Sequence, residues 1–278
     1  MLDFSNTQDW NFAVEERPVI VEGMGPIEGQ KALVRADTNE FLGQHSEGYK
    51  VVTHDTIVNA QYDAIKEANI SSDFDFNVRC LDGGKKLKID VIFPDLTVEP
   101  AVGDLIQFRT STFNSYDGSW AYQNQADGYR LACLNGMVSN ALIAKVWAKH
   151  TSKLNIEAAA ITLGKSVEIF QNQKEVWQGY IKAKVTRDEV EEFFKKKVVN
   201  VPQKSSEELF NKRQLNNLLS HFDDYSRSLG KNKWSLYNAL THWSTHTGEA
   251  AVPEVTTRYR EKKVTDAMAS RHFLELAA

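Results

Sequence analysis

The sequence predicts an α+β protein, in which a twisted antiparallel sheet with one inserted helix precedes a mostly helical C-terminal part. Apolar and polar residues alternate along 74–81 and 85–93, which is the period of β-strands. After about residue 136 the apolar residues recur at helical spacing. Strands and helices do not alternate as they would in a parallel βαβ fold. We therefore expect a β-rich sheet domain with packed helices over residues 1–150 and a helical region over 151–278.

The first half of the chain has the pattern of strands interrupted by one helix. Apart from a short strand after the polar turn 37–43, the expected strands cover residues 31–36, 49–53, 74–81, 85–93, 105–114 and 129–134. The helix is expected over 57–68, where Asp55 and Thr56 have side chains suited to cap its start. Asp82-Gly83-Gly84 predicts a hairpin turn, because glycine tolerates the positive φ of tight turns.

The second half of the chain shows helical periodicity and residues that start and stop helices. We expect helices over residues 136–148, 156–181, 209–229 and 234–247. Two segments, Thr186 to Glu189 and Ser205 to Glu208, match the capping-box pattern of a helix start. Pro202 marks a linker over 200–205, because proline cannot continue a helix.

The composition is that of an ordinary globular protein. The chain has 278 residues, 33 Lys+Arg against 37 Asp+Glu, a formal net charge of -4 and two cysteines. Two cysteines without CxxC spacing provide neither a disulfide framework nor a zinc motif. Apolar stretches such as 141–148 are much shorter than the roughly 20 residues of a membrane span, and no basic region followed by an apolar run opens the chain. We expect a reduced, cytoplasmic protein with no membrane partner.

Motifs for catalysis or cofactor binding do not occur in the sequence. GxxxxGK[ST], GxGxxG and GxSxG are all missing, and Leu163-Gly-Lys-Ser166 lacks the upstream glycine of a phosphate-binding loop. His242 and His246 lie four apart on an expected helix, but a zinc protease motif needs Glu where Trp243 stands. We therefore expect a protein that is not an enzyme and uses no cofactor. A metal-dependent nuclease with scattered ligands is a further hypothesis.

Charged residues are distributed unevenly along the chain. Residues 1–80 carry six basic and fourteen acidic side chains, a net of -8, whereas residues 141–204 carry twelve and seven, a net of +5. A cationic track beside aromatic rings is typical of proteins that bind single-stranded nucleic acid. The aromatic candidates are Tyr116, Trp120, Tyr122 and Tyr129. The nucleic-acid-binding candidates are Arg79, Lys85, Lys86, Lys88, Arg109, Arg130, Lys145, Lys149 and Lys153. The competing interpretation is that the lysines are solvated and the aromatic rings half-buried in the sheet.

The hairpin over 80–93 leads to a prediction about side-chain direction. Lys86 and Lys88 alternate with the apolar residues of the strand and therefore lie on its other face. If the apolar face packs on helices, these two lysines point away from the core, as do Lys85 and Arg79. A second wall of a cationic groove is expected on a helix whose lysines are four residues apart, namely Lys145, Lys149 and Lys153.

Five short segments together form the most specific signal in the sequence. They are Arg35-Ala-Asp-Thr-Asn-Glu-Phe-Leu-Gly43, Gly48-Tyr-Lys-Val-Val52, Asn114-Ser-Tyr-Asp-Gly-Ser119, Arg130-Leu-Ala-Cys-Leu-Asn-Gly136 and Trp234-Ser-Leu-Tyr-Asn-Ala-Leu-Thr-His-Trp-Ser-Thr-His246. Over residues 30–247 this combination resembles a phage- and plasmid-associated family catalogued as a domain of unknown function. The resemblance implies a mobile genetic element as the context and the cytoplasm of its host cell as the location.

The expected outline is also similar to that of single-strand annealing recombinases of the Red-beta and Erf kind. This similarity implies a homo-oligomeric ring or filament that binds single-stranded DNA without ATP or metal, with a phage exonuclease or single-strand-binding protein as a further partner. The leading hypothesis is a non-enzymatic phage protein that anneals or protects single-stranded DNA in recombination or replication. The alternative is a phage protein that acts by binding a host defence or replication protein.

Overall fold

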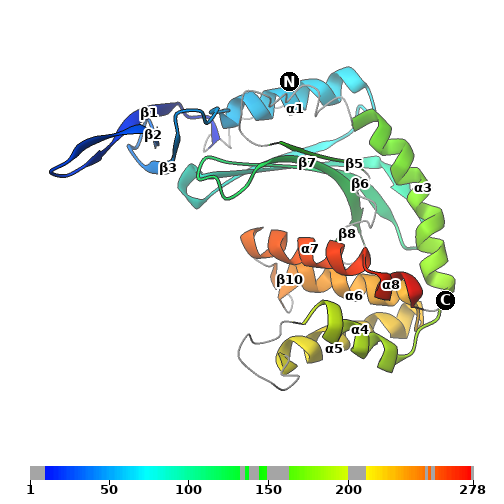
Figure 1. Ribbon diagram of the computed structural model, residues 1–278. Helices are drawn as coiled ribbons and strands as arrows, with labels where there is room; N and C mark the ends of the chain where they lie inside the picture. Colours follow the sequence, from blue (N-terminus) through cyan, green and yellow to red (C-terminus); the bar gives the residue numbers. More distant parts are fainter. Residues whose placement is uncertain are drawn as a thin grey trace. The chain divides into compact units, whose positions relative to one another are not determined.

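The computed structural model has an α+β fold, which confirms the predicted class (Figure 1). The structure describes residues 10–131, 135–137, 144–148, 163–199, 211–247, 250–251 and 254–276. Contacts divide the chain into two compact units, each assembled from separate stretches of sequence. Unit 1 comprises Met1–Leu96, Phe108–Ala126 and Ile143–Glu168, and unit 2 comprises Thr97–Gln107, Asp127–Leu142 and Ile169–Ala278.

The elements follow one another in the order that Figure 1 labels. The strands are β1 (Val14–Val21), β2 (Gly25–Arg35), β3 (Phe41–Ser46), β4 (Asp75–Leu81), β5 (Lys86–Val98), β6 (Ile106–Ser115), β7 (Tyr122–Arg130), β8 (Asn135–Met137), β9 (Ala144–Ala148), β10 (His246–Thr247) and β11 (Ala250–Ala251). The helices are α1 (His54–Ala68), α3 (Leu163–Lys182), α4 (Arg187–Lys197), α5 (Lys212–Leu229), α6 (Lys233–Thr245), α7 (Glu254–Met268) and α8 (Arg271–Glu275), with a 3₁₀ turn at Asp82–Gly84.

Two antiparallel sheets contain most of the strands. The smaller sheet has the order β1-β2-β3, and the larger has the order β4-β5-β6-β7-β8, with β9 also paired to β7. The predicted hairpin between β4 and β5 is confirmed: Arg79 lies opposite Lys88, and Gly83 in the turn has a φ of 66°. The positive φ explains why glycine occupies this position.

Helix α1 packs on one face of the larger sheet in unit 1 (Figure 1). Thr53, and neither Asp55 nor Thr56, is the N-cap, and its side chain accepts a hydrogen bond from the backbone N–H of Thr56. Ile57, Val58 and Ile65 of this helix are buried. The ring of Tyr62 meets that of Phe76 edge-on at 5.7 Å between centroids, so aromatic packing joins the helix to β4.

Helix α6 lies at the centre of unit 2 and is buried along almost its whole length. It packs against α5, α7 and β8, and the ring of Trp234 lies 5.8 Å from that of Trp177 on α3. The predicted capping box at Thr186 and Glu189 is present at the start of α4. Within the described residues, no helix is both long enough and apolar enough to cross a membrane.

Some predicted elements differ from the structure. The helix expected over 136–148 is wrong: β8 and β9 occupy parts of this segment, and both pair with β7. A run of Ala, Leu, Ile and Val suits a buried strand as well as a helix, so pairing with a neighbouring strand decided the outcome. Residues 49–53, expected in a strand, form none and lead into α1. The sequence did not predict β1 or α7. Residues 156–162 and the linker 200–205 lie outside the described residues.

Candidate nucleic-acid interface

Both faces of β5 are buried from Lys86 to Val91, and the two faces differ completely in chemistry. Leu87, Ile89 and Val91 lie on the apolar face. Lys86, Lys88 and Asp90 alternate with them on the other face and are also buried. The predicted alternation is therefore confirmed, but the prediction that the two lysines point into solvent is wrong. Buried charges need partners of opposite sign, so the surroundings of this polar face are central to its role.

Asp90 is the centre of one ion-pair cluster on the polar face. Its carboxylate contacts the guanidinium of Arg79, lies 3.2 Å from Nζ of Lys88 and accepts a hydrogen bond of 2.7 Å from Ser111 Oγ. Burial alone would raise the pKa of Asp90, but the charges of Lys88, Arg109 and Arg79 outweigh burial and hold this pKa below its ordinary range. Asp90 therefore stays ionised in the folded protein.

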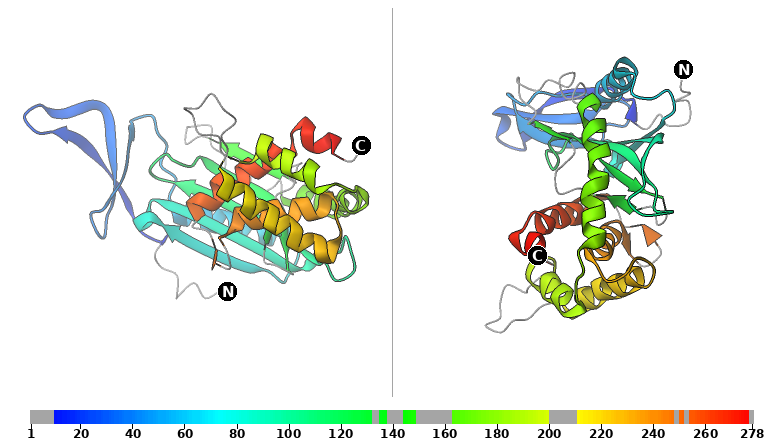
Figure 2. Two further views of the ribbon diagram at one scale, coloured as in Figure 1. Left: turned by 90° about the horizontal axis from the view of Figure 1, so that it is seen from below. Right: turned by 90° about the vertical axis from the view of Figure 1, so that its right-hand side faces the viewer.

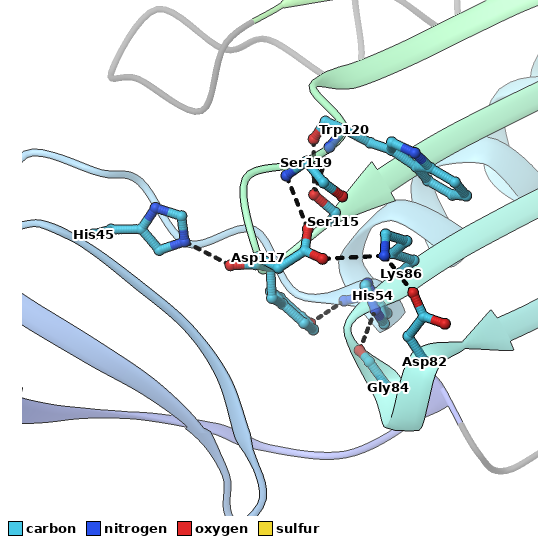
Figure 3. Close-up of polar contacts among 10 residues, drawn as sticks. His45, His54, Asp82, Gly84, Lys86, Ser115, Asp117, Ser119 and Trp120 are labelled. Atoms are coloured by element: carbon cyan, nitrogen blue, oxygen red, sulfur yellow. Dashed lines mark hydrogen bonds and ion pairs between the residues drawn. The ribbon is translucent and has the colours of Figure 1, made fainter. Parts of the chain in front are cut away.

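Lys86 is the centre of a second cluster at the start of β5 (Figure 3). Its ammonium contacts the carboxylate of Asp82 and lies 3.1 Å from Oδ2 of Asp117. Burial would lower the pKa of Lys86, but its hydrogen bonds to the two carboxylates outweigh burial and raise it. The indole of Trp120 lies 5.8 Å from the ammonium, so an aromatic ring also borders this cluster.

The polar side chains form a row across the larger sheet. Arg79 on β4 lies opposite Lys88 on β5, and Ser111 on β6 reaches Asp90. On β7, Asn124 bonds to α1 through Gln61, so alternation places Gln123 and Gln125 on the polar face. The row therefore begins with guanidinium and ammonium groups on β4 and β5 and ends with side-chain amides on β7.

The β6–β7 loop is held by polar contacts with α1 and β3. The imidazole of His54 stacks on the ring of Tyr116 at 4.1 Å between centroids, and the His54 backbone N–H donates to the Tyr116 hydroxyl at 2.7 Å. His54 Nε2 lies 3.0 Å from the carbonyl oxygen of Gly84, and His45 Nε2 lies 2.5 Å from that of Tyr116 (Figure 3). These contacts fix the backbone that carries Asp117 toward Lys86.

The close approach of β3 to this loop leads to a testable prediction. A Cβ added at Gly43 would lie 2.4 Å from the backbone oxygen of Tyr116, so Gly43→Ala forces the two segments apart. We expect a loss of about 1–3 kcal/mol in the free energy of unfolding, measured by urea denaturation. Gly48→Ala is the matched control, because nothing lies within 4 Å of its added Cβ. Equal stability of the two variants would contradict the close packing.

Not all predicted binding residues belong to this row. Lys85 is half-buried in the turn before β5, where its carbonyl accepts a hydrogen bond of 2.8 Å from the Tyr116 backbone N–H. Arg130 is buried in unit 2 against Asp104. Lys145 lies on β9 at the register position opposite Gln125, whereas Lys149 and Lys153 lie outside the described residues.

The aromatic rings expected as exposed stacking platforms are mostly in the interior. Tyr116, Trp120 and Tyr122 are buried, which contradicts the prediction that they offer free faces to bases. Burial raises the pKa of the Tyr116 and Tyr122 hydroxyls above the ordinary value for tyrosine, so neither ionises at neutral pH. Tyr129 is half-buried at the end of β7.

Comparison with known protein families identifies the family to which the chain belongs. The family model described as Domain of unknown function (DUF932) matches residues 41–272. The chain belongs to this family. No curated protein and no solved structure matches it. The match covers β3 through the first two residues of α8 and so includes the polar face of the larger sheet, whereas β1 and β2 precede it.

Sequence reasoning missed the acidic members of the site. Asp82, Asp90 and Asp117 compensate the cations of the polar face, but only the basic residues were predicted to form it. One signal was present, because Asp90 alternates in phase with Lys86 and Lys88 along the strand. The ion pair of Asp117 with Lys86 depends on the conformation of the β6–β7 loop, which no repeating pattern of apolar and polar residues predicts.

Three histidines of unit 2 lie side by side. The rings of His221 and His242 are 4.2 Å apart, and those of His242 and His246 are 4.8 Å apart, between centroids. His242 Nδ1 lies 2.9 Å from the hydroxyl of Tyr225, and burial lowers the pKa of His221. Across the part of the chain that the structure describes, no group of three or more His, Cys, Asp or Glu side chains is arranged to hold a metal ion.

Proposed function

We propose that this chain is a non-enzymatic DNA-binding protein of a phage or other mobile element. In this proposal it binds single-stranded DNA and anneals or protects it during recombination or replication, as a homo-oligomer. The observation that supports it best is the row of guanidinium, ammonium and amide groups across β4 to β7 on one sheet face. Phosphates bind to such cations, and amide side chains hydrogen-bond to bases and sugars.

The accessible end of this row is the position where DNA contact would begin. Lys88 and Arg109 are buried, whereas the Arg79 side chain is 45% exposed on β4. Arg79 already contacts Asp90, so a phosphate would join an existing ion pair instead of a free cation. Arg79 is therefore the residue whose replacement tests the proposal with the least disturbance to the fold.

Replacement of Arg79 should weaken binding of a labelled oligonucleotide. The chain should bind single-stranded DNA more weakly as NaCl rises from 50 to 200 mM, because phosphate neutralisation releases counterions. Arg79→Ala should reduce the slope of log K against log salt by about 0.7, the value for one single-strand phosphate contact. Fluorescence anisotropy measures both quantities. Arg227→Ala is the matched control, because its exposed guanidinium pairs with Asp224 on α5.

Two outcomes would contradict the proposal. The first is an unchanged affinity and salt slope in a folded Arg79→Ala variant, which would remove this face from the binding site. The second is an activity on DNA that EDTA abolishes and that Mg²⁺ or Mn²⁺ restores, because the proposal expects binding to persist in EDTA. In that case a metal-dependent nuclease would replace the proposal.

The alternative is a protein that acts by binding another protein, such as a host defence or replication factor. The observation in its favour is a group of exposed apolar side chains on the β1–β2 hairpin, including Ile20 and Met24. This alternative predicts no oligonucleotide binding even at 50 mM NaCl, so the anisotropy experiment separates the two.

A further inference from the structure

β4 is a terminal strand of the larger sheet and, among the described residues, is paired on one side only. All seven of its residues, Asp75 to Leu81, pair with β5 without a register shift. Figure 2 shows the β4–β5 hairpin, in cyan, along one border of the larger sheet. Alternate backbone N–H and C=O groups of β4 therefore face outward, where a further strand can pair with them.

The two terminal strands of the smaller sheet are protected in ways that β4 is not. Pro18 in β1 has no backbone N–H to donate, and the β1–β2 register shifts between Pro18 and Ile20. The β2–β3 register also shifts, and β3 lies against the β6–β7 loop, where His45 contacts the carbonyl oxygen of Tyr116. Proline, bulges and covering loops keep natural sheets from pairing edge to edge. β4 has no proline and no bulge, so its edge is suited to pairing with a strand of another molecule.

The sequence of β4 is complementary to itself when two copies of the strand run antiparallel. When Asn77 lies opposite Asn77 of a second copy, Asp75 lies opposite Arg79. In the same register Phe76 lies opposite Val78. Opposite charges, and an aromatic ring beside a β-branched side chain, are pairs that stabilise antiparallel strands. The two-fold axis repeats each pair, so five residues supply two ion pairs and two apolar pairs.

The side chains on the polar face of β4 are available for these pairs. Asp75 and Asn77 are exposed, and neither side chain has a hydrogen-bond or ion-pair partner among the described residues. The Arg79 side chain is 45% exposed and contacts Asp90. A guanidinium has five N–H donors, so Arg79 can bind a second carboxylate while it keeps the first. The carboxylate and the guanidinium of β4 therefore match each other across a strand pair.

We propose that β4 of one copy of this chain pairs antiparallel with β4 of a second copy, with Asn77 at the two-fold axis. Both copies use the same surface, so the contact is isologous and closes as a dimer. The two larger sheets then form one continuous sheet with both polar faces on the same side. Parallel pairing in register is disfavoured, because it places Asp75 beside Asp75 and Arg79 beside Arg79. The contact goes beyond the proposed function and requires no DNA.

The first test measures the dimer of the full chain without DNA. Sedimentation velocity at tens of micromolar should show a monomer–dimer equilibrium. Asp75→Arg should raise the dissociation constant about tenfold or more, because it places two arginines opposite each other at both ends of the strand pair. Glu175→Arg on α3 is the matched control, because it makes the same change of charge at an exposed carboxylate outside β4. It should leave the dissociation constant unchanged.

The second test determines the register by cross-linking. Opposite Cα atoms of an antiparallel pair lie about 4.5–5.5 Å apart, within the range that a disulfide spans. Asn77→Cys should therefore form a covalent dimer under mild oxidation, with the bond identified by mass spectrometry. Asp75→Cys should not, because in this register the two copies of residue 75 lie about 14 Å apart. The wild type is the control for reaction of the native Cys80 and Cys133.

Each contrary outcome overturns the proposal. A wild type that stays monomeric shows that the β4 edge binds no second copy. Unchanged dimerisation of Asp75→Arg, or equal cross-linking of Asp75→Cys and Asn77→Cys, shows that the contact lies elsewhere. Circular dichroism verifies folding, and Asp75→Lys replaces Asp75→Arg if that variant fails to fold. Oligonucleotide binding is measured separately with Arg79 unchanged, so a dimer that binds no DNA would reject the proposed function and keep this contact.

Discussion

Replacing Asp90 by Asn should lower the free energy of unfolding by about 3 kcal/mol at neutral pH. Removing one partner of a buried ion pair costs about 3–5 kcal/mol, because the remaining charge is buried without its counterion. The Asn side chain still accepts a hydrogen bond from Ser111, so we expect the lower end of that range. Lys88 and Arg109, which are buried near Asp90, are the cations that lose their carboxylate. Urea denaturation at pH 7 measures the difference.

The same variant should reveal a pH dependence of defined sign. The folded-state pKa of Asp90 is lowered, so its ionised form stabilises the protein above the unfolded-state pKa of about 3.9. That stabilisation is lost as pH falls below this value toward the lower folded-state pKa. The stability difference between wild type and Asp90→Asn should therefore be constant from about pH 8 to 5 and become smaller below about pH 4.

Asp95→Asn is the matched control for this experiment. Asp95 lies on the same strand but is exposed, with Ser71 as a hydrogen-bond partner. Its replacement should change stability by less than about 0.5 kcal/mol, as is usual for exposed sites. An equally small loss in both variants would show that the polar face of the sheet is solvated, and the burial described for Asp90 would be wrong.

Replacing Asp104 by Ala should destabilise unit 2 by about 3–5 kcal/mol. Asp104 Oδ1 accepts a hydrogen bond of 2.5 Å from Arg130 Nε, and Oδ2 accepts one of 2.8 Å from the indole N–H of Trp234. All three residues are buried. The substitution therefore leaves two buried donors, the guanidinium of Arg130 and the indole N–H of Trp234, without the carboxylate that they share.

The control for Asp104 is Asp266→Ala on α7. Asp266 pairs with Lys262 at 2.7 Å, but both side chains are exposed, and such pairs contribute about 0.3–0.5 kcal/mol. Thermal unfolding followed by tryptophan fluorescence suits both variants, because Trp234 belongs to the site. A loss below about 1 kcal/mol in Asp104→Ala would show that Arg130 and Trp234 find solvent or other partners when the carboxylate is removed.

Short-range patterns in the sequence predicted the elements that depend on neighbouring residues. The β4–β5 hairpin follows from alternation on both sides of Asp82-Gly83-Gly84. The start of α4 follows from the reciprocal hydrogen bonds of Thr186 and Glu189, which are three residues apart. Helix α6 was predicted with nearly correct ends. In each case the residues that decide the structure lie within a few positions of each other.

The candidate site depended on contacts between distant segments, which the sequence alone did not reveal. Alternation placed Lys86 and Lys88 on one face of β5, but it carries no information about what covers that face. The partners come from other strands and loops: Ser111 lies 21 residues from Asp90, and Trp234 lies 130 residues from Asp104. The same reason explains the error at β9, where pairing with β7 outweighed a local pattern that also suits a helix.

The sequence by itself determined the α+β class, the hairpin and the presence of basic residues on the polar face of β5. Only the tertiary structure decided that these lysines are buried beside Asp82, Asp90 and Asp117, and that both compact units are discontinuous in sequence. The physical reason is that a strand has two faces, and a charged side chain can be buried on either one when a distant segment supplies the opposite charge.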